Sequence, residues 1–387
     1  MQLPKGFYFN GIHAGLKEGK NELDLALIYS DTVCNATGVF TQNHFPGEPV
    51  KLGREVLKNG QLQSIVINSK ISNVATGSKG QEDAKNICAL LAKTLNIETQ
   101  NTLISSTGII GRPYPTGIIE KGLAALCENR ANNERAVNLA ATAIMTTDTV
   151  PKIHSARVGD ASIIIIAKGS GMIAPNMATM LVFIATDAQI PNSVLKPILK
   201  RVVDQSYNCL SIDFDTSTSD TCIIMANGKA GPVDENEFEQ TLGNLCKLSS
   251  MDIVKDGEGV DKVISCTLSG AIDHNMAKAT ASSIINSPLV KTMITGADPN
   301  WGRLIMAIGK TPDARLAGVQ PTIKMADQLV LLKGVPHEHD LHKLSQFIKE
   351  NEVIEIQVDL HLGDSEVNYL GANLTAGYVS INADYTT

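Results

Sequence analysis

The sequence predicts an α/β fold. Short runs of β-branched and apolar residues alternate with stretches of helical periodicity along most of the chain, and this alternation is typical of sheets covered by helices. One run, residues 161–167, is apolar at nearly every position, which indicates a strand buried on both faces. With 387 residues and 43% hydrophobic content, the chain can bury a large core, and we expect one large domain or two lobes.

The first half of the chain supplies these elements in alternation. Segments rich in β-branched and aromatic residues predict strands at 23–30, 38–41, 64–68, 102–106 and 161–167. Helical spacing of apolar residues predicts helices at 50–57, 84–95, 116–127 and 133–145. Residues 149–161 give no clear signal.

The second half continues in the same way. It begins with a nearly apolar run at 180–185 and a helix for which Ser193 is the expected N-cap. Further helices are predicted at 235–248 and 275–286, and further strands at 222–225, 260–268 and 354–362. The helix at 275–286 should end before Pro288, because proline disfavours helical geometry in the residue that precedes it. In the last strand apolar and polar residues alternate, so we expect one buried face.

Composition narrows the class of partner. The net charge of −7 and the lack of any Lys/Arg run speak against a nucleic-acid or anionic-membrane surface, so a small-molecule substrate is expected. The seven cysteines are scattered without a C-x-x-C pair and are expected to be reduced core residues. No apolar segment approaches the ~20 residues of a membrane span, and the first residues lack the form of a signal peptide. We therefore expect a cytoplasmic protein.

Thr179 is the candidate nucleophile. It stands directly before the apolar run 180–185 and follows a loop rich in Gly and Pro. A threonine hydroxyl needs a base within hydrogen-bond reach, and no histidine lies nearby in the chain. If the Ala178–Thr179 bond were cut, Thr179 would carry an α-amino group with a pKa of about 7.7 to 8, which suits a general base. A plain loop that leads into a core strand is the alternative interpretation.

The string KGSGMIAPNMATML at 168–181 resembles the processing and catalytic motif of the ornithine acetyltransferase family, also called glutamate N-acetyltransferase, of arginine biosynthesis. GVFTQN at 38–43 and GADPNWGR at 296–303 are similar to other family segments, so the resemblance covers essentially the whole chain. It implies an N-terminal-nucleophile-like core of two stacked sheets flanked by helices, with a second α/β lobe. It further implies cleavage into fragments 1–178 and 179–387, with two copies of each in the active molecule.

The resemblance also implies roles for particular residues. Thr179 is the nucleophile, and Thr107 and Gly108 form the oxyanion hole. The substrate contacts implied are Thr146, Lys168, Thr179, Glu258, Asn382 and Thr387. A lysine can pair with a substrate carboxylate as a point charge, and a carboxylate can bind a substrate amino group. Without the resemblance, these positions would be read as an ordinary turn, a helix cap, a solvated strand end and a surface loop.

The expected reaction is ping-pong acetyl transfer from N2-acetyl-L-ornithine to L-glutamate through an acetyl-Thr179 enzyme. No cofactor is expected, although acetyl-CoA serves as a co-substrate in some members of the family. Two alternatives stay open. One is an amidohydrolase or aminopeptidase on a related core, and the other is a non-catalytic paralogue that binds a metabolite.

Some positions depart from the family pattern. Residues 69–74 replace a small, Gly-containing and Asn-rich segment, Phe214 stands where the family commonly has Gly, and Ser219 stands where it has Asn. These changes put the local loop shapes in doubt. No metal site is expected: the carboxylates in 213–220 fit a polar turn, and of His337, His339 and His342 only the last two could share a helix face.

Overall fold

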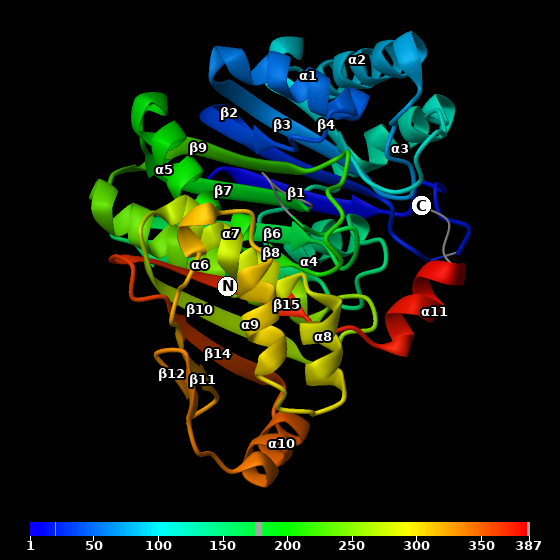
Figure 1. Ribbon diagram of the computed structural model, residues 1–387. Coiled ribbons are helices and arrows are strands. Elements are labelled where there is room, and N and C mark those ends of the chain that lie inside the picture. Colours follow the sequence, from blue (N-terminus) through cyan, green and yellow to red (C-terminus); the bar gives the residue numbers. More distant parts are fainter. Residues whose placement is uncertain (20, 175–179, 385–387) are drawn as a thin grey trace.

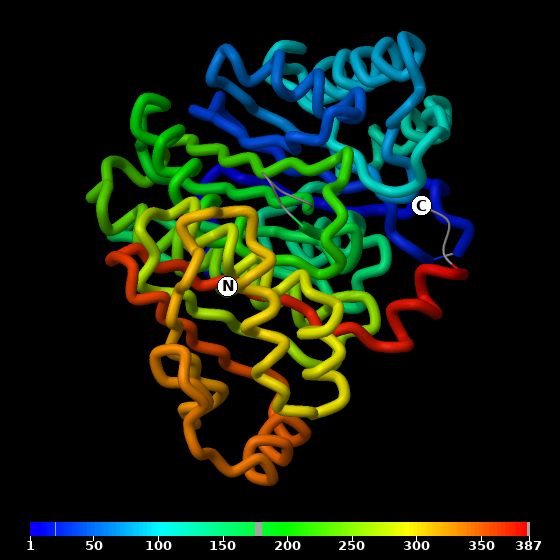
Figure 2. Tube along the Cα trace, viewed as in Figure 1, coloured from blue at the N-terminus to red at the C-terminus, as the bar shows by residue number. Residues whose placement is uncertain are grey.

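The structure is a computed structural model that describes residues 1–19, 21–174 and 180–384 (Figures 1 and 2). Its strands form two sheets with helices packed against them, so the predicted α/β class is confirmed. Short 3₁₀ segments connect the elements at Leu57–Asn59, Thr99–Asn101, Tyr207–Cys209 and Ala314–Leu316.

The first sheet has eight strands in the order β4-β3-β2-β9-β7-β6-β5, with β1 paired to β2. They are β1 (Phe7–Ile12), β2 (Leu25–Phe40), β3 (Gln61–Asn68), β4 (Thr102–Ser106), β5 (Lys152–Val158), β6 (Ala161–Lys168), β7 (Leu181–Gln189) and β9 (Thr221–Pro232). Strand β7 lies between β6 and β9, antiparallel to β6 and parallel to β9. The two strands predicted at 23–30 and 38–41 are one long strand, β2, with a register shift between Tyr29 and Cys34.

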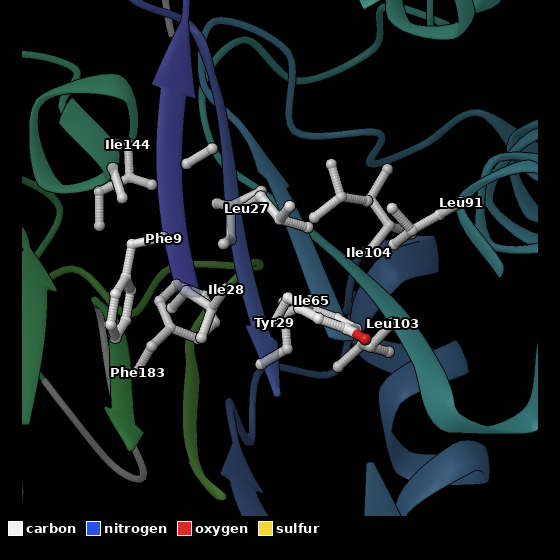
Figure 3. Packing of buried hydrophobic residues seen from close by; sticks show 14 of the residues in the cluster. Phe9, Leu27, Ile28, Tyr29, Ile65, Leu91, Leu103, Ile104, Ile144 and Phe183 are labelled. Atoms are coloured by element: carbon white, nitrogen blue, oxygen red, sulfur yellow. The ribbon is translucent and has the colours of Figure 1, made fainter. Parts of the chain in front are cut away.

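Helices cover both faces of this sheet. Ile164 and Phe183 pack in a core with α2 (Gly77–Leu95), α3 (Thr116–Glu128) and α4 (Glu134–Ala143), part of which Figure 3 shows. Their neighbours Ile163 and Val182 point the other way, because successive side chains of a strand alternate between its faces. They join a second core with α5 (Asn192–Asp204) and α6 (Glu235–Lys255). Burial on both faces explains the continuous apolar run of β6. The remaining helix, α1 (Glu48–Val56), packs near β4.

The second sheet has seven strands in the order β13-β12-β11-β14-β10-β15-β8. They are β8 (Leu210–Ser211), β10 (Val263–Ala271), β11 (Thr322–Met325), β12 (Gln328–Leu332), β13 (Val335–Pro336), β14 (Val353–Asp359) and β15 (Ser365–Ala372). One of its faces packs on α7 (His274–Ile285), α8 (Pro288–Thr295), α9 (Gly302–Gly309) and α10 (Leu341–Glu350). In β14, Ile354 and Ile356 are buried and Glu355 is exposed, which confirms the predicted one-sided strand. Helix α6 contacts strands of both sheets.

Several local predictions were wrong or incomplete. Helix α5 begins at Asn192 after Pro191, with no side-chain cap, so Ser193 is not its N-cap. Strand β5 lies in the segment that gave no signal, because its seven residues are mostly half-buried without alternation. Pro288 starts a new helix, α8, since proline is well tolerated in the first turn.

The last helix that the structure describes is α11 (Ala376–Asp384), which projects from the body of the molecule in Figure 1. All seven cysteines are buried and unpaired, and burial raises the pKa of the Cys266 thiol to about 12. In the ranges 1–19, 21–174 and 180–384, no helix is both long enough and apolar enough to cross a membrane.

Candidate active site

A cavity of about 370 Å³ is lined by residues at or next to the ends of three strands of the first sheet, β4, β6 and β7. Thr107 follows the end of β4, and Lys168 is the last residue of β6, paired in register with Leu181 at the start of β7. The pairing of β6 with β7 places Lys168 beside Leu181, and Thr107 lines the same cavity as these two residues. Glu258, after α6, and Asn382, on α11, line it from the second half of the chain. Residues more than 200 positions apart in the sequence thus share one cavity.

The six candidate residues that are described all line this cavity: Thr107, Gly108, Thr146, Lys168, Glu258 and Asn382. The cleavage pair Ala178 and Thr179, and the final residue Thr387, lie outside the described residues. Met180, which follows Thr179 in the chain, also lines the cavity, and its carbonyl oxygen accepts a hydrogen bond of 3.0 Å from the Thr221 amide. The roles assigned to all these residues stay predictions.

Lys168 is a buried cation, only 8% exposed. Its Nζ donates to Thr146 Oγ1 at 2.9 Å and to Thr107 Oγ1 at 3.2 Å. In the described part of the chain no carboxylate oxygen lies within 4 Å of this Nζ. Burial lowers the pKa of Lys168, although the charge of Asp148 acts in the opposite direction. A buried ammonium held by hydroxyls alone can still accept an anionic group from a ligand.

The turn at Thr107 and Gly108 offers two donors to the cavity. The Thr107 hydroxyl accepts from Lys168 and keeps its own proton for donation. Its backbone amide is not available, because it donates to Asn68 O at 3.1 Å. The Gly108 amide has no partner among the residues that the structure describes. Gly108 has φ +125°, and a Cβ there would lie 2.2 Å from the carbonyl carbon of Lys70, so only glycine fits.

Glu258 is buried, although its flanking glycines suggested a surface loop as the alternative interpretation. Its Oε2 accepts from Asn382 Nδ2 at 2.8 Å, and its backbone amide donates to Ser170 O at 2.8 Å. Gly171 packs against the carboxylate so closely that a Cβ would lie 2.3 Å from Oε2. The carboxylate is therefore fixed between α11 and the loop that follows Lys168.

Sequence reasoning missed the part played by Asp213, which it placed in a polar turn. Its Oδ2 accepts from the Met172 amide at 2.6 Å and its Oδ1 from the Ile173 amide at 2.7 Å. It therefore anchors the strand-like segment that leads toward the cleavage pair. Burial raises the pKa of Asp213. Asp220 also lines the cavity, and burial raises its pKa well above the usual range of a carboxyl. The cluster of acids in 213–220 was the only available signal.

The positions that depart from the family pattern have unusual surroundings. Lys70, in the segment 69–74, has φ +82°, and Phe214 has φ +71° with 67% of its surface exposed. Both φ values lie in the left-handed region that favours glycine. Ser219 is buried and lines the cavity. Within the described ranges no group of three or more His, Cys, Asp or Glu residues could hold a metal ion, and His339 Nδ1 contacts His337 O at 2.7 Å.

Two helix-covered sheets, with a lysine, hydroxyl groups and an amide that has no described partner converging on one cavity, define an α/β enzyme with a site suited to acyl chemistry. The model of the ArgJ family matches residues 8–387, and the chain belongs to this family. This confirms the resemblance found in the sequence.

Two relatives of similar length agree with this assignment. The chain is 45% identical over 385 residues to the arginine biosynthesis bifunctional protein ArgJ 2 of Clostridium acetobutylicum, covering 99% of this chain and 98% of the relative. It is 39% identical over 389 residues to the glutamate N-acetyltransferase Oat2 of Streptomyces clavuligerus, with 99% and 98% covered. The crystal structure of the ornithine acetyltransferase of Mycobacterium tuberculosis complexed with ornithine aligns at 31% identity and a TM-score of 0.41, covering 45% of this chain and 94% of that chain.

Proposed function

We propose that this protein transfers the acetyl group of N2-acetyl-L-ornithine to L-glutamate in arginine biosynthesis, and that it does so in the cytoplasm. The name of one relative, glutamate N-acetyltransferase, supports glutamate as the acetyl acceptor, and the name of another supports a role in arginine biosynthesis. One observation in the site carries the proposal: buried Lys168 has only hydroxyl partners in the described residues, and the buried carboxylate of Glu258 lines the same cavity. An ammonium and a carboxylate in one cavity suit a substrate that carries one charge of each sign.

The proposed chemistry begins with self-cleavage of the Ala178–Thr179 bond, in which water is consumed, Ala178 is left with a carboxylate and Thr179 with a free amine. The Thr179 hydroxyl oxygen attacks the acetyl carbonyl of acetylornithine, and the amine takes the hydroxyl proton. The carbon–nitrogen bond then breaks, ornithine leaves with that proton on its nitrogen, and an acetyl ester remains on Thr179. The neutral amine of glutamate attacks this ester, and the amine of Thr179 takes a proton from the attacking nitrogen. The ester carbon–oxygen bond then breaks, that proton passes to the Thr179 oxygen, and acetylglutamate is released. In both steps the Thr107 hydroxyl and the Gly108 amide donate to the oxyanion.

In the same proposal the substrate carboxylate pairs with Lys168 beside Thr146, and the distal amino group pairs with Glu258. Asn382 fixes the Glu258 carboxylate, and Thr387 completes the site. Fragments 1–178 and 179–387 stay together, two copies of each. Acetyl-CoA is an additional acetyl donor to be tested, and no other cofactor enters the reaction.

Two measurements test the proposal. The first is a mass spectrum of the purified protein, in which we expect a fragment that begins at Thr179. The second follows the labelled acetyl group of acetylornithine with and without glutamate, with Thr179→Ala as the inactive control. Labelled acetylglutamate in the sample with glutamate, and little free acetate in the sample without it, supports the transferase. Free acetate released at the same rate without glutamate would instead indicate an amidohydrolase. An intact chain that binds ornithine without turnover would indicate a non-catalytic paralogue.

A further inference from the structure

Three buried charged residues lie beneath the proposed substrate site. Lys152 Nζ donates to Asp148 Oδ1 at 2.8 Å and to Asp256 Oδ2 at 2.6 Å. The side chains of Lys152, Asp148 and Asp256 are 1%, 0% and 7% exposed, so this ion triad is almost completely removed from water. None of the three lines the cavity. They come from two segments more than 100 positions apart, 148–152 and 256.

Asp148 connects two of the proposed substrate residues. Its Oδ2 accepts from the backbone amide of Thr146 at 3.1 Å. Its Oδ1 accepts from the backbone amide of Gly169 at 2.6 Å, directly after Lys168. One carboxylate therefore fixes the backbone on both sides of the Lys168–Thr146 hydrogen bond.

Asp256 connects the third proposed substrate residue, Glu258, to the same segments. It accepts from the Thr149 amide at 3.0 Å and from the Thr149 hydroxyl, and it stands two residues before Glu258. Two further hydrogen bonds fasten the same segments together. The Glu258 amide donates to Ser170 O at 2.8 Å, and the hydroxyl oxygens of Ser170 and Thr147 lie 2.6 Å apart.

We propose that Asp148, Lys152 and Asp256 are positioning residues that hold Thr146, Lys168 and Glu258 at the separation the amino-acid substrate requires. This inference rests on the proposed function, since that function makes the three held residues substrate contacts. A buried ion pair adds little net stability compared with apolar residues of the same size, because desolvation offsets the attraction between the charges. Fixing a geometry is a better explanation of the triad than stability.

Asp148 also acts on Lys168 through its charge. Burial lowers the pKa of Lys168, and the carboxylates that face it and raise its pKa are Asp148, Glu258 and Asp220. The facing cations are Lys152, whose charge lowers the pKa of Lys168, and Lys17, whose own pKa is lowered by burial and by the charge of Lys168. Loss of the Asp148 charge should therefore let Lys168 lose its proton at lower pH. An uncharged Lys168 cannot pair with a substrate carboxylate.

The deciding experiment compares Asp148→Asn with the parent protein in steady-state kinetics and in calorimetric titration with ornithine. Asn keeps the shape and one acceptor oxygen but removes the charge. We expect KM for acetylornithine and the dissociation constant of ornithine to rise by roughly tenfold, while kcat changes less than about threefold, as for loss of uniform binding. The alkaline limb of kcat/KM should move to lower pH.

A second variant covers the case in which Asp148→Asn does not fold, because breaking a buried pair is costly. Asp256→Asn leaves the Asp148–Lys152 pair intact and should also raise KM. Asp187→Asn is the matched control. Asp187 is also buried, at 1% exposed, and its carboxylate accepts hydrogen bonds from the backbone amides of Lys5 at 2.8 Å and Ser162 at 2.6 Å. It lies near the end of β7 that is far from Leu181. We expect this control to keep the parent KM and pH profile.

The outcomes separate the inference from the proposed function. A parent protein that neither turns over acetylornithine nor binds ornithine contradicts the function itself. If the parent is active and the Asp148→Asn and Asp256→Asn variants keep its KM and the alkaline limb of its kcat/KM profile, only the positioning role is overturned. A fall in kcat alone, with KM and the pH profile unchanged, would overturn it as well.

Discussion

At the scale of single residues, Lys168 gives the most direct prediction about binding. Its ammonium is buried and has only hydroxyl partners in the described chain, so Lys168→Met should remove the substrate's counter-charge without leaving an unpaired carboxylate within 4 Å. We expect KM for acetylornithine to rise on the order of 100-fold, as for truncation of one partner of a buried charge pair. Thermal stability should stay equal or increase, because burial disfavours the ammonium.

Steady-state kinetics and a melting curve of the same preparation check this prediction. Lys200→Met, on the exposed side of α5, is the matched control and should leave both quantities unchanged. A Lys168→Met protein with the parent KM would show that the substrate carboxylate binds elsewhere.

Lys291 gives a prediction about pH. Its side chain is buried, its Nζ donates to Ile212 O at 2.7 Å and Ala372 O at 2.6 Å, and burial lowers its pKa to about 8. In the unfolded chain the lysine keeps its usual pKa of about 10.4, so between these values the unfolded state binds more protons than the folded state. This contribution therefore makes the free energy of unfolding rise with pH from about 8 to about 10.4.

Urea unfolding at a series of pH values from 7 to about 10.4, on the parent and on Lys291→Met, tests this sign. Because other groups titrate in both proteins, the informative quantity is the difference in unfolding free energy, parent minus variant. It should increase by roughly 1–3 kcal/mol across the window. A difference that stays constant with pH would contradict the lowered pKa.

At the scale of elements, the loop around Phe214 carries strain that one substitution can remove. Phe214 has φ +71° and is 67% exposed, so its ring contributes little burial while its backbone is in the left-handed region. A non-Gly residue there costs roughly 1–2 kcal/mol. Glycine would relieve this cost, but it also increases the entropy of the unfolded chain, which offsets part of the gain. We therefore expect Phe214→Gly to raise the free energy of unfolding in denaturant by a net ~0.5–1 kcal/mol.

Phe45→Gly is the comparison for Phe214→Gly, since Phe45 is 62% exposed and does not have a positive φ. Glycine should destabilise the protein at that position. Equal effects at the two sites would mean that the left-handed backbone of Phe214 stores no strain.

The same scale shows what the sequence could predict. Strands β6 and β7 were predictable because burial on both faces requires a continuous apolar run, and β14 because burial on one face requires alternation. Strand β5 was not, since most of its residues are half-buried without alternation. Lys152 is buried there through Asp148 and Asp256, and no local pattern records Asp256, which lies more than 100 residues away. In the candidate site, six of the cavity-lining residues were found through motifs that resemble the family, whereas the contacts of Asp148 and of Asp213, which also lines the cavity, required the fold.

At the scale of the whole molecule, the predicted fragments 1–178 and 179–387 would be interleaved rather than adjacent. Strand β7 of the second fragment pairs with β6 of the first, and β9 of the second pairs with β2 of the first. Both cores of the first sheet also combine residues of both fragments, such as Ile164 with Phe183 and Ile163 with Val182. Separating the fragments would therefore break two strand ladders and expose both cores.

We therefore expect the cleaved protein to behave as one cooperative unit. The fragments should elute together in size-exclusion chromatography without denaturant, and they should separate only over the urea range in which the circular dichroism signal of the sheet is lost. Cleavage itself should cost little stability, because the nearest described residues on both sides of the bond are held by the rest of the protein: the Ala174 amide donates to Asp215 O at 3.0 Å, and Met180 O accepts from the Thr221 amide. Uncleaved Thr179→Ala protein is the reference. If its urea midpoint exceeded that of the cleaved protein by several molar, or if the cleaved fragments separated in native buffer, the shared sheet would not be what holds them together.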